Sequence, residues 1–168
     1  FLDDPKRYGG VLPAADPALV APGAGTEDRC LIDDVNVLLA RYTEQMDGVH
    51  IRAALGTARD IAARGNQYLQ KCRLDNALFN GSRAQCDTVL AVAANLIYLL
   101  SAVFHPFIPG VAADISAQLN APLRLIPDAL ELDLKPGHVL GRPKHLFTHI
   151  DDRQIDEWRA LFGGKQSA

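Results

Sequence analysis

The sequence predicts an all-α fold, an antiparallel helical bundle with a short extended excursion and a C-terminal helix. Two runs of the chain repeat apolar residues at spacings of three and four, which places them on one face of a helix. A third run, residues 85–104, is apolar on nearly every side, as in the central helix of a core. With 168 residues, 48% of them hydrophobic, the chain is long enough to bury one sizeable core.

The N-terminal part predicts a connection followed by an amphipathic helix. Residues 9–25 are rich in glycine, proline and alanine, so we expect a surface connection without regular structure. Thr26 then suits the N-cap of the first helix, and Gly48 suits its end. The apolar stripe of this helix comprises Leu31, Val35, Leu38, Leu39, Tyr42 and Met46.

Three further helices follow in the bundle. The second helix carries arginines opposite its apolar face and ends before residues 74–76. The core helix ends at His105-Pro106, and Pro109 suits the first turn of a shorter fourth helix. The apolar face of the second helix comprises Ile51, Ala54, Leu55, Ala58, Ile61, Ala62, Gly65, Tyr68 and Leu69. The buried stripe of the fourth comprises Val111, Ile115 and Leu119.

The last part of the chain predicts an extended segment and a terminal helix. Leu130, Leu132 and Leu134 alternate with charged residues, as expected of a half-buried strand. A turn at Pro136-Gly137 follows, and Asp151 suits the N-cap of the terminal helix. We expect this helix to pack back on the bundle with Trp158 in the interior. Its inward stripe comprises Ile155, Trp158, Leu161 and Phe162.

We expect one folded domain, with the bundle in residues 1–136 and a closing segment in residues 137–168. The start has neither an initiator methionine nor a secretory signal, so we interpret Phe1 as a cut in a longer chain. No apolar run reaches the length of about 18 residues that a membrane span requires, so residues 89–104 are expected to be buried and no membrane partner is expected. Three cysteines without a Cys-x-x-Cys pair indicate free thiols in a reducing, cytoplasmic setting.

The net charge of −3 conceals an asymmetry along the chain. Residues 1–47 hold four basic and nine acidic side chains, whereas residues 48–73 hold five basic side chains against one acid. Such a basic stretch in an acidic protein fits either a polyanionic partner or a solvated helix face. Both interpretations stay open on charge alone.

The sequence carries no recognisable catalytic signature. It has no phosphate-binding loop, no nucleophile elbow, no zinc-protease pair and no dinucleotide fingerprint. The five histidines have no fixed acidic partner, and the acid pairs Asp33-Asp34 and Asp151-Asp152 fit capping or solvation. We therefore expect no catalytic residue, no metal site and no cofactor in this chain.

Three segments in the correct order carry a resemblance to a known family. They are Gly65-Asn66-Gln67-Tyr68-Leu69-Gln70, the stretch from Pro106-Phe107-Ile108-Pro109 to Gln118-Leu119-Asn120, and Gly137-His138 through Trp158-Arg159 to Phe162-Gly163-Gly164. Together they resemble the C-terminal anticodon-binding domain of the methionyl-tRNA synthetases, which are class I enzymes, in the eukaryotic cytosolic form. The resemblance covers nearly the whole chain.

The resemblance implies recognition of a tRNA anticodon by a part of the enzyme that is itself non-catalytic. The resemblance also implies a parent enzyme that is a methionine-tRNA ligase using ATP and Mg²⁺, with its catalytic domain elsewhere in the same longer chain. The implied partner is a methionine-accepting tRNA with a CAU anticodon. By resemblance, a helix preceding this chain supplies an Asn and an Arg to the anticodon.

One departure from the family concerns an aromatic residue. Many members have a Trp that stacks on an anticodon base, and Leu74-Asp75 occupies that position here in a run that resembles fungal members. Stacking of this kind contributes ~1–3 kcal/mol per base. Phe79 and Arg73 are the two candidate substitutes on sequence grounds, and a simple core position is the preferred interpretation of Phe79.

The candidate tRNA-binding residues lie at the end of the second helix and in the loop after it. We expect the amide side chains there to read base edges and the basic side chains to hold phosphates. The set comprises Arg64, Asn66, Gln67, Gln70, Lys71, Arg73, Asp75 and Asn76. Capping or contacts between helices remain an alternative for Asn66 and Gln67.

Two other functions stay open from the sequence. One is the corresponding domain of another class I synthetase, because the helical architecture is shared. The other is a helical adaptor that binds protein through the acidic first helix and Trp158.

Overall fold

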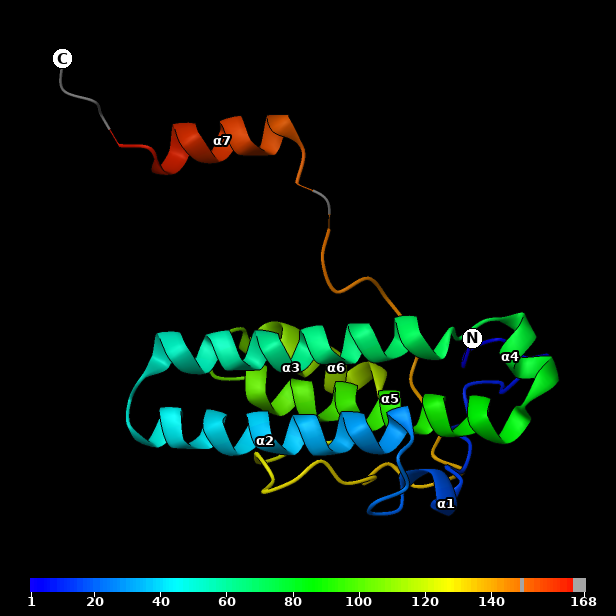
Figure 1. The fold of residues 1–168 in the computed structure, drawn as a ribbon. Helices are drawn as coiled ribbons and strands as arrows, with labels where there is room; N and C mark the ends of the chain where they lie inside the picture. Colours follow the sequence, from blue (N-terminus) through cyan, green and yellow to red (C-terminus); the bar gives the residue numbers. More distant parts are fainter. Residues whose placement is uncertain (149, 165–168) are drawn as a thin grey trace.

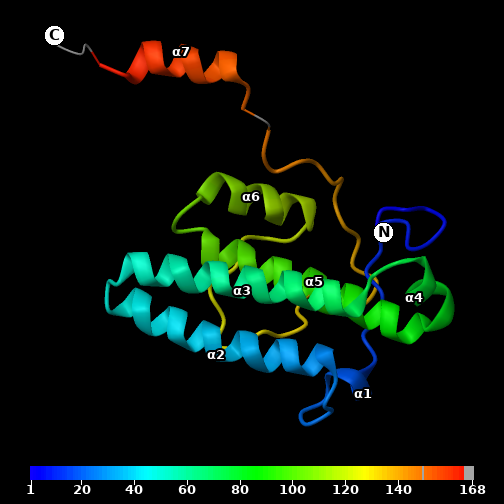
Figure 2. The same cartoon turned by 45° about the horizontal axis from the view of Figure 1, so that its top comes forward.

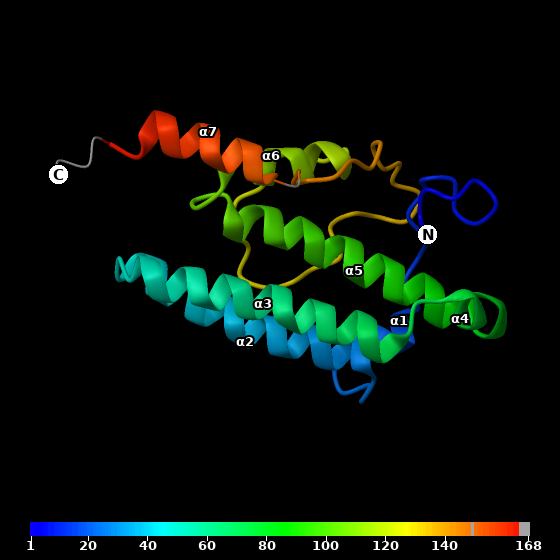
Figure 3. The ribbon, with the colours of Figure 1, turned by 90° about the horizontal axis from the view of Figure 1, so that it is seen from above.

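A computed structural model describes residues 1–148 and 150–164 of the chain. Three long antiparallel helices form the bundle, and α5 lies between the α2–α3 pair and α6 (Figures 1, 2 and 3). The helices are α1 (Pro17–Val20), α2 (Glu27–Asp47), α3 (Ile51–Cys72), α4 (Asn76–Gly81), α5 (Arg83–Phe104), α6 (Pro109–Gln118) and α7 (Asp152–Phe162). The all-α prediction is confirmed.

The predicted first two helices form the α2–α3 hairpin. Thr26 caps α2 as predicted, since its Oγ1 accepts a hydrogen bond from the Arg29 N–H at 3.2 Å. Gly48 caps the other end, and the predicted inward stripe of α2 is buried at Leu31, Val35, Leu39 and Tyr42. On α3, Ile51 and Leu55 were predicted on the buried face but are exposed. They lie in the first two turns of α3.

Helix α5 is the central core helix. By length and composition it passes the test for a membrane span, but 72% of its most apolar window is buried inside the bundle. A Cβ placed on Gly65 of α3 would lie 2.5 Å from Cδ2 of Leu96, so a larger residue at this position would force the Leu96 side chain to move. On α6 the buried residues are Ala112 and Ser116, with the predicted Val111 and Ile115 only partly covered.

Two short helices were missed in regions where the sequence predicts connections. Asp16 caps α1 through the N–H of Ala18, and Asp75 caps α4 by accepting from the N–H of Leu78 at 2.9 Å. In both cases an Asp precedes a single turn or little more, which is too short for periodicity to reveal.

The predicted strand around Leu130–Leu134 is wrong. Within the described residues the only strand-like pairing is an isolated antiparallel bridge between Val11 and Val139. The alternating burial is nevertheless present, since Leu130 and Leu134 are both buried. Side-chain oxygens take the place of a neighbouring strand: the Leu130 N–H donates to Asn36 Oδ1 at 2.7 Å, and the Leu134 N–H donates to Asn95 Oδ1 at 2.8 Å.

The predicted packing of the terminal helix on the bundle is also wrong. Asp151 does cap α7 as expected, with the Gln154 N–H donating to its Oδ1 at 2.8 Å. However, α7 has no buried residue, Trp158 is 44% exposed and Phe162 is 76% exposed. Figures 1 and 2 show α7 standing apart from the bundle on an extended connection. Its apolar stripe therefore has no partner among the described residues.

Candidate nucleic-acid interface

The segment from Gly65 to Gln70 divides its residues between the core and the surface. Gly65 and Tyr68 are buried against the rest of the bundle. Asn66, Gln67 and Gln70 are exposed on the opposite side of α3. This division follows from the helical period, because residues three apart share a face. The amide side chains therefore face solvent, and the opposite face of the same helix is packed against the bundle.

A buried acid holds the end of α3 that carries these amides. Asp28 of α2 is 1% exposed, and the Tyr68 hydroxyl donates to its Oδ1 at 2.6 Å. Gln85 of α5 donates to Oδ2 at 2.9 Å, so one carboxylate joins three helices. Burial and the hydrogen bond to Asp28 raise the pKa of the Tyr68 phenol, which therefore stays protonated and remains a donor. Burial, followed by the charge of Asp28, also raises the pKa of the Cys72 thiol to about 11.

Four of the candidate residues surround a shallow surface depression of about 560 Å³. It is lined by Glu27, Gln67, Gln70, Lys71 and Arg73. The one acid in this lining, Glu27 of α2, accepts from Lys71 Nζ at 3.1 Å. The depression thus combines two amides and two cations with a single carboxylate, a set that can hydrogen-bond base edges and attract phosphates.

Arg64 is committed to helix α2. Its Nε donates to Asp34 Oδ2 at 2.7 Å, and its Nη2 lies 3.7 Å from Glu27 Oε2. The side chain is only 13% exposed. The structure therefore brings Arg64 close to the depression with Nε and Nη2 already paired with acids of α2 and with Nη1 buried.

The residues after α3 have distinct local roles. Arg73 ends α3 in the left-handed conformation at φ 47° and is exposed. This conformation is sparsely populated for a residue with a side chain, and it turns the chain sharply toward α4. Asp75 is the N-cap of α4, as described above. Asn76 is exposed, and its Oδ1 accepts a hydrogen bond from Arg7 Nη2 of the N-terminal segment.

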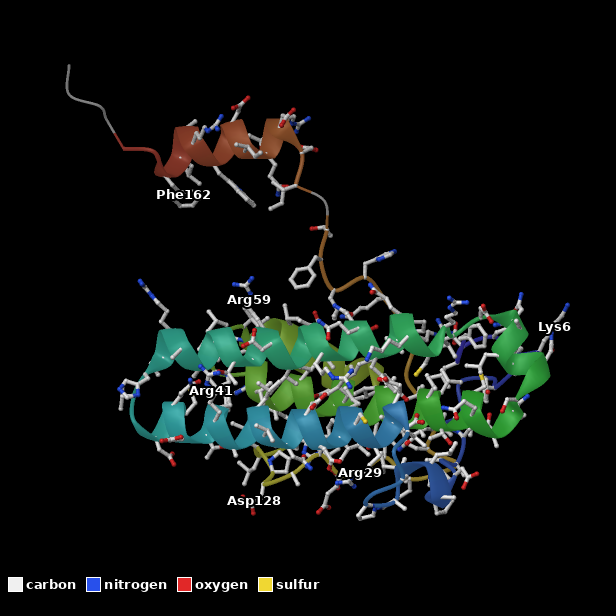
Figure 4. The ribbon with its side chains drawn as sticks, in the orientation of Figure 1. Lys6, Arg29, Arg41, Arg59, Asp128 and Phe162 are labelled. Atoms are coloured by element: carbon white, nitrogen blue, oxygen red, sulfur yellow. The ribbon has the colours of Figure 1, made fainter. Side chains whose placement is uncertain are left out.

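The basic segment is partly neutralised by the acidic helix beside it. Arg64 and Lys71 pair with acids of α2, whereas Arg52, Arg59 and Arg73 make no ion pair within the part of the chain that the structure describes. Figure 4 shows Arg59 extending from α3 on the side away from α2. Arg52 lies seven positions before Arg59, two helical turns, so these two cations share the outer side of α3, whereas Arg73 lines the depression.

A cluster of arginines and aromatic rings adjoins the candidate residues and was not predicted. We call it the arginine–aromatic cluster, and it comprises Phe1, Arg7, Tyr8, Phe79 and Arg83. Phe79 of α4 is only partly buried, so its preferred interpretation as a simple core residue is wrong. No sequence signal joins residues that lie more than 70 positions apart, and the cluster is visible only in the fold.

The family described as the anticodon binding domain of methionyl tRNA ligase matches residues 20–167 of this chain. The probable cytoplasmic methionine–tRNA ligase of Schizosaccharomyces pombe is 44% identical over 163 residues, which cover 96% of this chain and 20% of that protein. The cytoplasmic methionine–tRNA ligase of Saccharomyces cerevisiae is 40% identical and is covered to 21%. The mouse cytoplasmic enzyme is 32% identical, so the chain is more similar to the two yeast enzymes than to the mouse enzyme.

The fold agrees with a solved structure of the same kind. The free form of Mycobacterium tuberculosis methionyl-tRNA synthetase superimposes with a TM-score of 0.72 at 21% identity, over 87% of this chain and 29% of that one. The chain thus spans about a fifth of the length of the curated relatives it matches.

Proposed function

Because the chain belongs to the family of anticodon-binding domains of methionyl-tRNA ligases, we propose that it binds the anticodon loop of a methionine-accepting tRNA. The proposed anticodon is CAU. The observation that supports this most directly is the exposed amide and basic lining of the depression at the end of α3. Unpaired loop bases expose the edges that such side chains read, and RNA recognition targets loops of this kind.

We assign base-edge contacts to the amides and phosphate contacts to the exposed cations. Asn66, Gln67 and Gln70 lie on one exposed side of α3, and Asn76 extends the surface toward the N-terminal segment. Lys71 and Arg73 serve the phosphates. Lys71 is held only by its exposed ion pair with Glu27. It can exchange Glu27 for a phosphate at low cost, because such exposed pairs contribute ~0–1 kcal/mol.

Two candidate residues receive positioning roles instead. Arg64 holds α3 to Asp34 and Glu27, and its low exposure disfavours a direct phosphate contact. Asp75 starts α4 and thereby sets the direction of the chain after Arg73. Both act on the tRNA through the backbone that they fix.

We further propose that the longer protein is a cytoplasmic methionine–tRNA ligase that uses ATP and Mg²⁺ in a catalytic domain outside this chain. The names of the two yeast relatives support the reaction and the compartment. The reaction joins methionine to adenylate with release of pyrophosphate and then transfers it to the tRNA. This chain contributes anticodon binding and no catalytic group.

The comparisons and the contacts of α2 favour the proposed function over the alternatives raised by the sequence. The relatives that cover the chain are methionine–tRNA ligases rather than other class I enzymes. An adaptor function would require the acidic face of α2 to be free, yet Glu27 and Asp34 are engaged with α3.

The test measures binding of this chain to RNA hairpins with a CAU loop and with the first of these bases changed. We expect tighter binding to the CAU hairpin. Gln70→Ala should reduce that preference, because one hydrogen bond of about 1 kcal/mol corresponds to roughly fivefold in affinity. Lys71→Ala should weaken both hairpins alike, since phosphate contacts carry no sequence information.

Arg153→Ala is the matched control, because Arg153 pairs only with Glu157 on the separate helix α7. It should leave both affinities unchanged. Equal affinity of the unaltered chain for the two hairpins would contradict the proposed function.

A further inference from the structure

The arginine–aromatic cluster holds two guanidinium groups against aromatic rings at the end of the bundle near α4. Arg7 lies 3.9 Å above the ring centroid of Phe1, and Arg83 lies 4.5 Å from that of Tyr8. Arg83 is also 4.4 Å from the ring centroid of Phe79. The guanidinium of Arg83 thus contacts two rings that come from different parts of the chain and that meet edge to face.

The orientation of Arg83 is fixed by a carboxylate. Its Nε donates to Asp87 Oδ1 at 2.9 Å, and the Tyr8 hydroxyl donates to the same oxygen at 2.6 Å. Burial, then the hydrogen bond to Asp87, raises the pKa of the Tyr8 phenol, so this donor is retained. The planar guanidinium of Arg83 is therefore fixed in orientation before a ligand binds, and little rotamer entropy remains to be lost on binding.

Arg83 is the member of the cluster that is open to a ligand. Its side chain is 50% exposed, whereas that of Arg7 is 22% exposed. Arg7 is further occupied by an ion pair with Asp4 at 3.2 Å and by the hydrogen bond to Asn76. Through Asn76 the cluster is continuous with the candidate tRNA-binding residues.

The charge balance of the cluster favours a base over a phosphate as its ligand. Asp87 already neutralises Arg83, and Asp4 neutralises Arg7. An added phosphate would meet these acids at short range and gain little. A nucleobase instead needs a flat and partly desolvated surface, and unstacked RNA bases stack on guanidinium planes as well as on aromatic rings.

We propose that Arg83 is a base-stacking residue for an unpaired nucleotide of the bound RNA loop, with Tyr8, Phe79 and Asp87 as positioning residues. This proposal rests on the proposed function, since it adds a second contact to the same RNA. The nucleotide that stacks is a neighbour in the loop of those read by the amides of α3. The stacking surface is built from three separate segments of the chain.

The experiment uses Arg83→Lys, which keeps the charge and removes the plane. Affinity is measured for the CAU hairpin and for a series in which each loop nucleotide in turn is abasic. Arg83→Lys should weaken binding to the complete hairpin by about 5- to 150-fold, the range that corresponds to stacking of one base. For the hairpin that lacks the stacking base, the variant and the unaltered chain should bind equally.

Two controls separate stacking from folding and from charge. Arg153→Lys makes the same substitution at an exposed ion pair of α7 and should change nothing. Thermal unfolding followed by circular dichroism should give Arg83→Lys the midpoint of the unaltered chain within a few degrees, because exposed pairs contribute little to stability.

The proposal is overturned if Arg83→Lys binds every hairpin as the unaltered chain does, or if it weakens all abasic hairpins by the same factor. In either case a persisting preference of the unaltered chain for the CAU loop would leave the proposed function standing. If the unaltered chain does not bind the CAU hairpin at all, both the function and this proposal fail.

Discussion

At the scale of residues, the segment from Gly65 to Gln70 combines two requirements in six positions. Gly65 allows α3 to approach Leu96, and Tyr68 reaches the buried Asp28. The residues between them face solvent and carry amides. The sequence alone cannot separate the packing role from the binding role, because each role restricts which residue can stand at a position. The structure separates them by burial.

The hydrogen bond from Tyr68 to Asp28 leads to the first stability prediction. Tyr68→Phe removes a donor from a buried carboxylate, so we expect the free energy of unfolding to fall by about 1.5–3 kcal/mol. Tyr42→Phe is the matched control. It removes a hydroxyl that donates at 2.9 Å to the neutral carbonyl of Val103, so its cost should be about 1 kcal/mol. Urea unfolding of both variants measures the two losses of unfolding free energy. Equal losses would show that the hydrogen bond to the Asp28 carboxylate is no stronger than one to a neutral carbonyl.

At the scale of elements, the long helices were predictable and the chain between and after them was not. Periods of 3.6 residues sustained over about 20 positions leave little choice, and Thr26 and Gly48 mark the ends of α2. The alternation at Leu130–Leu134 correctly predicted burial, yet it cannot tell whether a strand or an asparagine side chain satisfies the backbone. For α1 and α4, a single capping Asp is too weak a signal.

The exposure of the candidate amides was predictable from the sequence, but the contacts of the candidate cations were not. The exposed amides of α3 were named correctly as surface residues because the helical period fixes their direction. The commitment of Arg64 to Asp34 depends on the crossing of α2 and α3, which the sequence does not contain. The cluster around Arg83 could not be predicted either, because it also depends on how distant segments meet in the fold. An amphipathic pattern in α7 likewise predicts that a face needs covering without identifying what covers it.

Because helix α7 lies apart from the bundle, substitution of its tryptophan should have little effect on the free energy of unfolding. Trp158 is the only tryptophan of the chain, and it contacts no part of the bundle core. Trp158→Ala should therefore change the free energy of unfolding by less than about 0.5 kcal/mol, whereas Leu39→Ala in the core should cost about 2–5 kcal/mol. Circular dichroism during urea unfolding gives both values. A loss above 2 kcal/mol for Trp158→Ala would restore the packed terminal helix that the sequence suggested.

At the scale of the whole molecule, the fold places the acidic part of the sequence against the basic part, on two neighbouring helices. The acidic N-terminal part places Glu27 and Asp34 on α2, beside Arg64 and Lys71 of the basic segment. The hairpin thus neutralises part of the charge that the sequence separates. The RNA-binding potential that remains depends on which cations a bound phosphate can recruit from these pairs.

Glu27 offers the sharpest test of this balance, because it is the single acid in the lining of the depression and competes with RNA for Lys71. Glu27→Gln should strengthen binding to the CAU hairpin by about two- to fivefold, the equivalent of an exposed pair. It should also steepen the salt dependence by roughly one phosphate contact, because the released Lys71 becomes available.

The control for Glu27→Gln is Asp60→Asn, which makes the same change of charge at an exposed acid of α3 outside the depression. A general effect of net charge would raise the affinity of both variants alike, since long-range attraction depends on total charge and is screened within about 10 Å at 0.1 M salt. A local effect would appear in Glu27→Gln alone. If the two variants bind the hairpin with the same affinity and the same salt slope, Lys71 is not a phosphate contact. The electrostatic part of docking would then fall to Arg73 and the unpaired arginines along the outer side of α3.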